Sequence, residues 1–295
     1  MEDRLVPNSA TAVTDVMPTV TPFDAALGAE VSKINLSKPL SDAQFAIVED
    51  AFLKYHVLVF RGQPLTDEEH LAFARRFGEL EGHVNKSTHH KKHNKVQVFS
   101  NVKDDGKTTG VHPELGTYVW HTDKSYVAIP SLTTVLRSPA IAGKGGDTLF
   151  TNTHAAYDDL DDTTKQKING LKAEHSWKRS REKVGERPAT ADEIAAAPPV
   201  QHPIARTHPV TGRKCIYVGS HTSHVIDMDY DEGVQLLKDL EAHATQNKYI
   251  YTHKWQVDDV MMWDNRSTMH CVMPYDAAKE KRAVHRVVVK GDKPV

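Results

Sequence analysis

Several features that would assign this chain to a specialised class are missing from its sequence. It has only two cysteines in 295 residues, Cys215 and Cys271, and their spacing indicates neither a disulfide framework nor a zinc site. No apolar run approaches the roughly 20 residues that span a bilayer, and the N-terminus lacks the apolar core of a secretory signal. We therefore expect a cytoplasmic protein without a membrane partner.

An excess of charge of one sign is also missing. Lysine and arginine together number 37, aspartate and glutamate 39, and the formal net charge is −2. This balance argues against a general nucleic-acid binder, because such proteins neutralise phosphates with clustered positive charge. What remains is a chain with 39% hydrophobic residues, which is enough to bury a sizeable core.

The residue pattern predicts a mainly β fold with flanking helices. Two amphipathic helices are expected first, with Ser41 and Thr66 as their N-caps. From Val96 onward, short strand-like runs alternate with Gly, Pro, Asn and Asp, which is typical of a sandwich or barrel. The strand candidates are VQVFSNV, TYVWHT, LTTVLRS, DTLFTN, HPIARTHP, KCIYVG, YIYTHKW, DVMMWDN and AVHRVVVKG.

The expected organisation is one domain. Residues 1–20 are polar and aperiodic, as in a loose N-terminal arm, and residues 21–295 form the predicted domain. Residues 154–199 are charged, Ala-rich and helical in pattern, so we expect a helical insertion outside the β core. The run HVNKSTHHKKHNK (83–95) is either a solvated basic loop or part of a lid over about 83–118.

The sequence holds 18 histidines, and the placement of two of them indicates a metal site. In VWHTDKSY, His121 and Asp123 are two residues apart, and alternate residues of a strand point to one face. His270, in MMWDNRSTMHCV, is the best candidate for a third ligand. Two histidines and a carboxylate form the facial triad of non-haem Fe(II) oxygenases, which leaves three octahedral positions for a bidentate 2-oxo acid and O2. A zinc hydrolase uses the same ligand types.

Two arginines follow the third candidate ligand. Arg282 and Arg286 are four apart in KRAVHR, so on a strand both guanidiniums project to one face. A guanidinium binds a carboxylate through two parallel hydrogen bonds, so Arg282 suits the distal carboxylate of 2-oxoglutarate. A solvated basic strand end is the alternative interpretation.

Seven sequence blocks, in order, resemble the taurine dioxygenase family of Fe(II)/2-oxoglutarate enzymes, including its 2,4-dichlorophenoxyacetate dioxygenase branch. The likeness runs from roughly Gly28 to Pro294. The resemblance implies a double-stranded β-helix, or cupin-like jelly roll, with flanking helices. The blocks are LVFRGQPL, FARRFGELEG, WHTDKSY, GGDTLFTNTHAAYDDL, RTHPVTGRK, WDNRSTMH and KRAVHR.

The resemblance also implies an activity. The enzyme would decarboxylate 2-oxoglutarate to succinate and CO2 with O2, while hydroxylating a small anionic organic substrate, with or without subsequent fragmentation of the product. Related halogenases lack the carboxylate ligand, so Asp123 favours hydroxylation. By position, the matching residues are the iron ligands His121, Asp123 and His270, the 2-oxoglutarate-binding Thr148 and Arg282, and Arg286 near the substrate's anionic group.

The substrate is predicted from departures within the family. Thr117 stands where taurine dioxygenase has an asparagine that contacts taurine, and GSHTSHV (219–225) looks like the phenoxyacetate enzyme. Both argue against taurine, and the 219–225 segment favours an aryloxyalkanoate-like carboxylate, whereas His83, near the matching position of a taurine-contacting histidine, favours taurine. Further pocket candidates are Tyr118, Lys124, Tyr126 and His221, with strand packing as the alternative for the tyrosines and solvation for the lysine.

Three other functions stay open at this point. Within the class, the alternative is an alkylsulfonate or sulfate-ester dioxygenase. Outside it, a zinc hydrolase uses similar ligands, and a non-catalytic jelly-roll binding protein would have lost part of the triad or the cosubstrate arginine. We also expect a homo-oligomer, since these are common among soluble enzymes.

Overall fold

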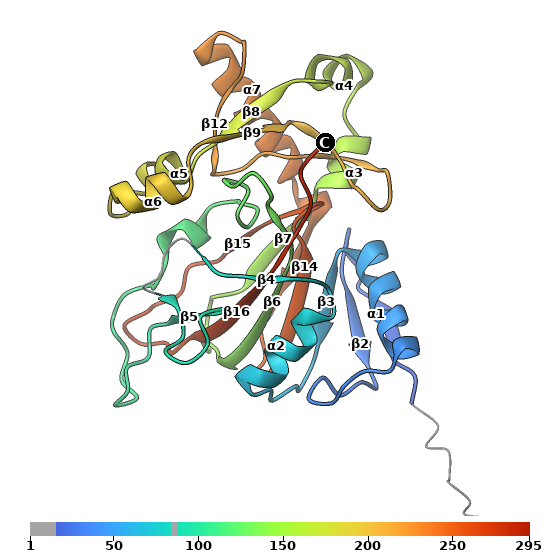
Figure 1. Ribbon diagram of the computed structural model, residues 1–295, viewed down its shortest axis with the longest axis vertical. Coiled ribbons are helices and arrows are strands. Elements are labelled where there is room, and N and C mark those ends of the chain that lie inside the picture. The colour runs from blue at the N-terminus through green and yellow to red at the C-terminus, as the bar shows by residue number, and fades with distance from the viewer. Residues whose placement is uncertain (1–15, 84–87) are drawn as a thin grey trace, which may run out of the picture.

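An eight-stranded sheet forms one layer of the computed structural model, which describes residues 16–83 and 88–295 (Figure 1). The strand order is β1-β2-β3-β14-β6-β16-β4, with β5 also paired to β16. Its pairs are antiparallel except β2 with β3. The strands are β1 Thr19–Pro22, β2 Ala29–Ser32, β3 Val57–Phe60, β4 Leu80–Glu81, β5 Val96–Ser100, β6 Ser131–Ala140, β14 Val260–Asp264 and β16 Ala283–Lys290.

A three-stranded antiparallel sheet packs against the inner face of the large one. Its order is β13 (Ile250–His253), β7 (Thr148–Asn152) and β15 (Thr268–Val272). Phe150 of β7 and Trp263 of β14 belong to the apolar cluster between the sheets, with ring centroids 5.3 Å apart. The predicted jelly roll is confirmed.

Two helices cover the outer face of the large sheet (Figure 1). α1 (Asp42–Tyr55) and α2 (Asp67–Arg75) begin after the predicted caps Ser41 and Thr66, and each cap forms a capping box. Along β16, Val287 and Val289 join the cluster on the helix side, whereas Val284 joins the inner cluster. Alternate residues of β16 therefore face opposite layers.

The predicted helical insertion over 154–199 holds four helices but also a strand that the pattern did not indicate. β8 (Lys172–His175) lies in this segment and is the central strand of a sheet in the order β12-β8-β9. Only Ala173 and His175 of its four residues are buried, so the alternation is too short to stand out from charged helical surroundings. Around it lie α3 Thr153–Asp158, α4 Asp162–Ile168, α5 Trp177–Val184, α6 Ala191–Ala196, β9 Val200–Pro203, β12 Thr222–Val225 and α7 Tyr230–Ala244.

The remaining elements are short. A hairpin joins β10 (Ala205–Thr207) to β11 (Lys214–Ile216), and the 3-10 turns are η2 (Leu115–Tyr118) and η3 (Asn247–Tyr249).

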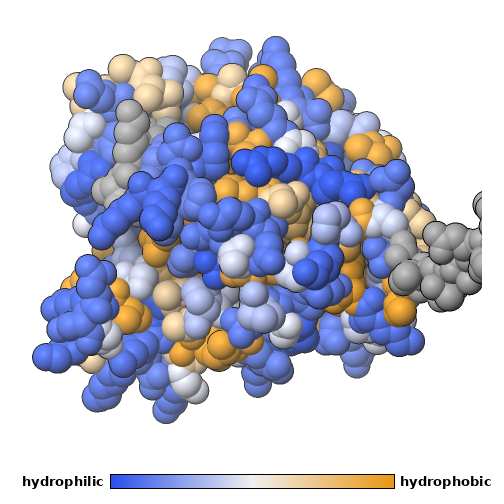
Figure 2. All heavy atoms as spheres, turned by 60° about the horizontal axis from the view of Figure 1, so that its bottom comes forward, coloured by the Kyte–Doolittle hydropathy of each residue, from blue (hydrophilic) through white to orange (hydrophobic). Residues whose placement is uncertain are grey.

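Two expected boundaries shift. β1 begins at Thr19, so the last two residues of the predicted arm belong to the large sheet, while residues 1–15 lie outside the described part. Within the predicted lid over 83–118, β5 is a strand of that sheet, and residues 84–87 are not described. In the described ranges, no helix is long and apolar enough to cross a membrane. The surface in Figure 2 carries mainly hydrophilic side chains with scattered apolar ones.

Candidate metal centre and adjoining cavities

Three buried side chains converge between the two sheets of the jelly roll. One ligand atom each from His121, Asp123 and His270 lies within 4.8 Å of the others. The Nε2 atom of His270 is 3.8 Å from Oδ2 of Asp123, and the two imidazole centroids are 4.1 Å apart. The structure therefore brings together the three residues that the sequence pattern selected, although they are 149 positions apart at the extremes (270 − 121).

The predicted strand through His121 and Asp123 is wrong. His121 forms an isolated bridge with His270, in which each backbone N–H donates to the other's carbonyl at 3.0 and 2.9 Å. Asp123 lies in the turn that follows, and the next residue, Lys124, has a positive φ of 55°. The turn, and not the pleat of a strand, directs the carboxylate toward His270.

Both imidazoles are in a form that can bind a metal. Nδ1 of His121 donates to the carbonyl of Val119 at 2.8 Å, which leaves the Nε2 lone pair available. Nδ1 of His270 is buried and has no hydrogen-bond partner among the described residues. Burial lowers the pKa of both rings, and at His270 the neighbouring His121 lowers it further. Neutral imidazole is the ligand form, so the donors suit a cation.

The carboxylate of Asp123 is held by two donors. Arg286 donates to Oδ1 at 2.8 Å, and the hydroxyl of Thr134 donates to Oδ2 at 2.6 Å. Burial raises the pKa of Asp123, but Arg286, the two histidines and Thr134 lower it more, so it lies well below its ordinary value. The group is therefore an anion at neutral pH.

Asn265 links these groups, and sequence reasoning missed both it and Thr134. Its amide nitrogen donates to the Thr134 hydroxyl at 3.0 Å, and its oxygen accepts from the Asp123 backbone N–H at 3.3 Å. Asn265 lies within the WDNRSTMH block, so a signal existed for it. Thr134 lies in an ordinary strand run and gave none.

One cavity beside the triad is suited to a carboxylate. Its lining includes Thr148 and Arg282, together with His121 and His270. Arg282 is 5% exposed, and its guanidinium has no acceptor among the described residues. Burial lowers the pKa of Arg282, because a positive charge without a negative partner is unfavourable away from water. Trp255 donates to the Thr148 hydroxyl at 3.0 Å, so that hydroxyl keeps its own hydrogen for another acceptor.

A second cavity adjoins the triad and holds most of the predicted substrate residues. The exception is Tyr118, whose ring instead packs against His112 with centroids 4.3 Å apart. The predicted residues that line this cavity are His83, Thr117, Lys124, Tyr126, His221 and Arg286.

The polar candidates in this cavity already have protein partners. Lys124 is buried, and its ammonium lies 2.6 Å from Oε2 of Glu81, so the solvated interpretation of this lysine is wrong. Arg286 also donates to Gln97 Oε1 at 2.6 and 3.0 Å, in addition to its bond with Asp123. These bonds fix both cations against the cavity wall.

Sequence reasoning also missed a charged cluster at this cavity. Arg181 NH1 lies 2.7 Å from Glu186 and 3.9 Å from Glu114, and all three residues are among the lining. Burial and the nearby Glu186 raise the pKa of Glu114 to about 7. The guanidinium of Arg181 also lies over the ring of Trp177 at 5.1 Å. The only signal was the i, i+4 spacing of Trp177 and Arg181 on α5.

A jelly roll with two neutral histidines and one carboxylate converging in its interior has the architecture of a mononuclear non-haem Fe(II) oxygenase. The family described as "Taurine catabolism dioxygenase TauD, TfdA family" matches residues 19–288. The chain belongs to this family, and it is an Fe(II)- and 2-oxoglutarate-dependent dioxygenase that uses O2.

Individual relatives agree with this assignment. The chain is 37% identical over 270 residues to the 2,4-dichlorophenoxyacetate dioxygenase of Burkholderia sp. (strain RASC), covering 89% of this chain and 91% of that one. It is 33% identical to an (S)-phenoxypropionate dioxygenase of Sphingobium herbicidovorans, covering 92% and 95%. The crystal structure of AAD-2 with Mn(II) and N-oxalylglycine superposes with a TM-score of 0.84 at 37% identity, covering 95% and 98%.

A more distant relative has another substrate. The α-ketoglutarate-dependent sulfate ester dioxygenase of Pseudomonas putida is 28% identical, covering 94% of this chain and 90% of that one.

Proposed function

We propose that His121, Asp123 and His270 hold the Fe(II) and that Arg282 and Thr148 bind the distal carboxylate of 2-oxoglutarate. The observation that carries this assignment is the buried Arg282 guanidinium, which has no acceptor within residues 16–83 and 88–295 and shares a cavity with both histidines. A buried cation of this kind requires an anionic partner. A planar guanidinium matches a carboxylate through two parallel hydrogen bonds.

The protein's part in the reaction is to position groups and to exclude water. When bound, the iron with 2-oxoglutarate and O2 supplies the oxidising power, which yields succinate, CO2 and a hydroxylated substrate. Arg286 and Thr134 hold the two oxygens of Asp123, so this ligand keeps one orientation and one charge. The triad residues are at most 7% exposed, which keeps bulk water from the reacting atoms.

The substrate that the second cavity supports best is an aryloxyalkanoate carboxylate. The rings of Phe99, Tyr126 and Trp177 line this cavity, and Tyr126 and Trp177 have centroids 4.9 Å apart. Such rings suit an aryl group. Arg286 and Lys124 also line this cavity, and although each is paired with a carboxylate of the protein, each carries further N–H groups that can donate to a substrate carboxylate. Hydroxylation at the carbon beside the ether oxygen would give a hemiacetal that collapses to a phenol and a carbonyl acid.

The sulfate-ester dioxygenase relative favours a second candidate within the class. A sulfate ester also carries an anionic group and a C–H bond beside an oxygen, so the same cations would serve it. The two substrates differ in what leaves the hydroxylated carbon, which is a phenol in one case and sulfate in the other.

The test is a panel of aryloxyacetates, chiral aryloxypropionates, alkylsulfonates and sulfate esters, incubated with Fe(II), ascorbate and 2-oxoglutarate. We expect succinate and phenol in step for the aryloxy acids, after subtraction of substrate-free turnover. Release of sulfate or sulfite without phenol would assign the alternative. His121→Ala and Asp123→Ala should abolish turnover, and full activity without Fe(II) or 2-oxoglutarate would contradict the proposal.

The cosubstrate site has its own matched pair of variants. Arg282→Ala should raise the KM for 2-oxoglutarate about ten- to hundredfold, since a hydrogen bond to a charged group contributes roughly 1.5–3 kcal/mol. Arg282→Lys keeps the charge but loses the planar fork, so its KM for 2-oxoglutarate should lie between those of the wild type and Arg282→Ala. An unchanged KM in Arg282→Ala would show that another residue binds the distal carboxylate.

A further inference from the structure

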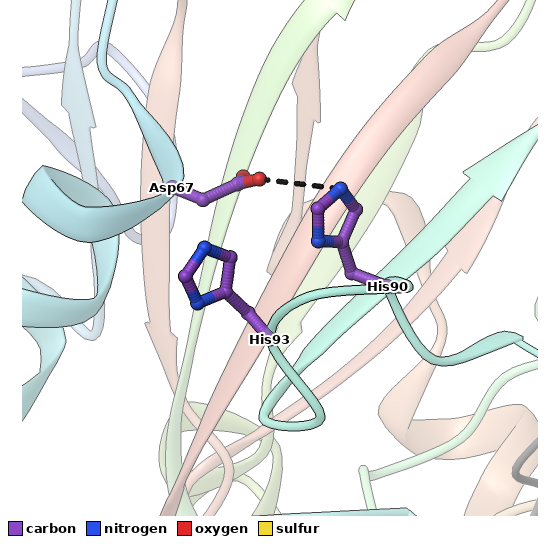
Figure 3. A group of neighbouring side chains, drawn as sticks. All are labelled: Asp67, His90 and His93. Atoms are coloured by element: carbon purple, nitrogen blue, oxygen red, sulfur yellow. Dashed lines mark ion pairs between the residues drawn. The ribbon is translucent and has the colours of Figure 1, made fainter.

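A second group of metal-ligating side chains lies outside the dioxygenase site. One ligand atom each from Asp67, His90 and His93 lies within 4.8 Å of the others, and Figure 3 shows the His90 imidazole facing the carboxylate with the His93 imidazole close beside them. Nε2 of His90 is 3.5 Å from Oδ2 of Asp67. Nε2 of His93 is 3.1 Å from Oε1 of Glu68, so a fourth oxygen lies at the edge of the group.

Local backbone structure positions each of these ligands. His90 and His93 are three apart in a turn closed by two backbone bonds with Val96, His90 N–H to its carbonyl at 2.8 Å and Val96 N–H to the His93 carbonyl at 2.9 Å. Their rings are parallel within 9°, with centroids 5.5 Å apart. Asp67 is the first residue of α2, directly after the capping box of Thr66. The histidine-rich segment therefore has a defined conformation here.

The large sheet separates this group from the dioxygenase site. On β16, Nδ1 of His285 lies 3.0 Å from Oδ1 of Asp67, whereas the next residue, Arg286, bonds to Asp123. Because neighbouring residues of a strand face opposite sides, the two groups lie on opposite faces. The Asp67 group is on the face that α2 covers, and its residues are partly exposed.

The charges around Asp67 leave one oxygen available to a cation. Oδ1 is taken by Arg137 at 2.5 Å and by His285, whereas Oδ2 faces His90. Burial raises the pKa of Asp67, but Arg137 and His285 lower it more, to about 2, so the group is an anion. Burial lowers the pKa of His285, so this ring adds no positive charge at neutral pH.

We propose that Asp67, His90 and His93 bind a divalent transition metal of the zinc type, at a site distinct from the iron site. Two imidazoles and one carboxylate oxygen suit Zn2+, with Glu68 or water in the fourth tetrahedral position. The ion would join the turn at 90–96 to α2. Gln97 directly follows this turn and bonds to Arg286, so the ion stabilises a support of the dioxygenase site.

The affinity should be moderate, because the ion must displace existing contacts. The weak bond from the Lys92 N–H to Nδ1 of His90, at 3.4 Å, is lost when Nε2 binds metal and Nδ1 carries the proton. Arg137 also competes for the Asp67 carboxylate. We expect a Kd on the order of micromolar at neutral pH.

The experiment uses the full chain with the iron triad disabled by His121→Ala and Asp123→Ala, so that Zn2+ at the second site is measured alone. Equilibrium dialysis with metal analysis should give about one Zn2+ per chain. Adding His90→Ala and His93→Ala should abolish it, whereas adding His89→Ala, in the same segment but bonded to the His83 backbone, should retain it. In the same background, Zn2+ should raise the Tm only where both ligands remain.

Two outcomes would overturn the proposal. The first is no binding by the triad-disabled chain, provided that its circular dichroism matches that of the wild type. The second is Zn2+ binding that persists after His90→Ala and His93→Ala. Should the triad substitutions themselves unfold the chain, the wild type loaded with Fe(II) and 2-oxoglutarate replaces that background. In that background, the Zn2+ that the wild type binds in addition to Fe(II) should be lost in His93→Gln. Retention of this Zn2+ in the variant would also overturn the proposal.

Discussion

The two oxygens of Asp123 are bound by donors from different strands, Arg286 of β16 and Thr134 of β6. This arrangement holds the carboxylate in one orientation before any metal arrives, which lowers the cost of binding. The spacing of His121 and Asp123 could be found from the sequence, because a ligand pair is local. The hydroxyl of Thr134 could not, because only the tertiary fold brings β6 beside the turn that holds Asp123, and Thr134 belongs to no motif.

Replacing Thr134 tests this support directly. Thr134→Val removes the hydroxyl that donates to Asp123 and should weaken Fe(II) binding roughly tenfold or more. Thr133→Val is the matched control, because that hydroxyl is equally buried but donates to the carbonyl of Trp263. Titration of the two apoproteins with Fe(II) under anaerobic conditions measures both affinities. Equal weakening in both variants would mean that lost stability, and not carboxylate orientation, is responsible.

At the scale of elements, a turn places the carboxylate ligand, whereas strands place His270, Thr134 and Arg286. The sequence pattern predicted a strand at His121, yet the carboxylate of Asp123 is directed by a turn in which Lys124 has a positive φ. Strand periodicity and a turn can both bring residues i and i+2 to one side, so the pattern alone could not distinguish them. The strand β8 was missed because it has four residues, of which two are buried, and so short an alternation of buried and exposed residues does not indicate a strand.

The turn before β7 gives the prediction at this scale. Gly145 has φ of +75°, and a Cβ there would lie 2.5 Å from the carbonyl oxygen of Pro274. Gly145→Ala should therefore shift the turn that leads to Thr148 and lies beside Arg282, raising the KM for 2-oxoglutarate. Gly106→Ala is the matched control, since its φ of +78° is similar but a Cβ there would meet no atom of the described residues within 4 Å beyond its chain neighbours.

Comparison with Gly106→Ala separates the steric clash at Gly145 from the strain of a positive φ, which both variants share. Gly106→Ala should lower the free energy of unfolding by about 1 kcal/mol, and Gly145→Ala by several times as much. Denaturant unfolding measures both values. Similar losses in the two variants would contradict the proposed clash.

For the whole molecule, the family resemblance predicted the jelly roll and the convergence of ligands that are far apart in sequence. The surroundings of the second cavity were less predictable. Its charged wall combines Glu114 from the segment before η2 with Arg181 of α5 and Glu186 beyond that helix. Such a cluster depends on how distant segments pack, and single-sequence patterns hold little information on that.

This wall makes stability depend on pH. The pKa of Glu114 is raised from 4.5 to about 7, so the folded chain holds the proton more tightly than the unfolded chain. Its contribution to stability is therefore complete below about pH 4.5 and is lost as the pH rises through about 7. Glu114→Gln should reduce the fall in Tm between about pH 5 and 8, whereas Glu49→Gln, exposed on α1, should not. Identical pH profiles for wild type and Glu114→Gln would contradict this assignment.

The backbone bridge between His121 and His270 has a consequence for redesign. Each of these ligands is tied to the other by a reciprocal pair of main-chain bonds, so their separation is independent of the cavity-lining segments on either side. The exposed segment 103–111 should therefore tolerate insertion, deletion or exchange with that of a relative while both imidazoles keep their spacing, whereas Asn101, which is bonded to the backbone of Arg282, should be kept. The substrate preference of this enzyme could then be changed without changing the spacing of its two histidine ligands.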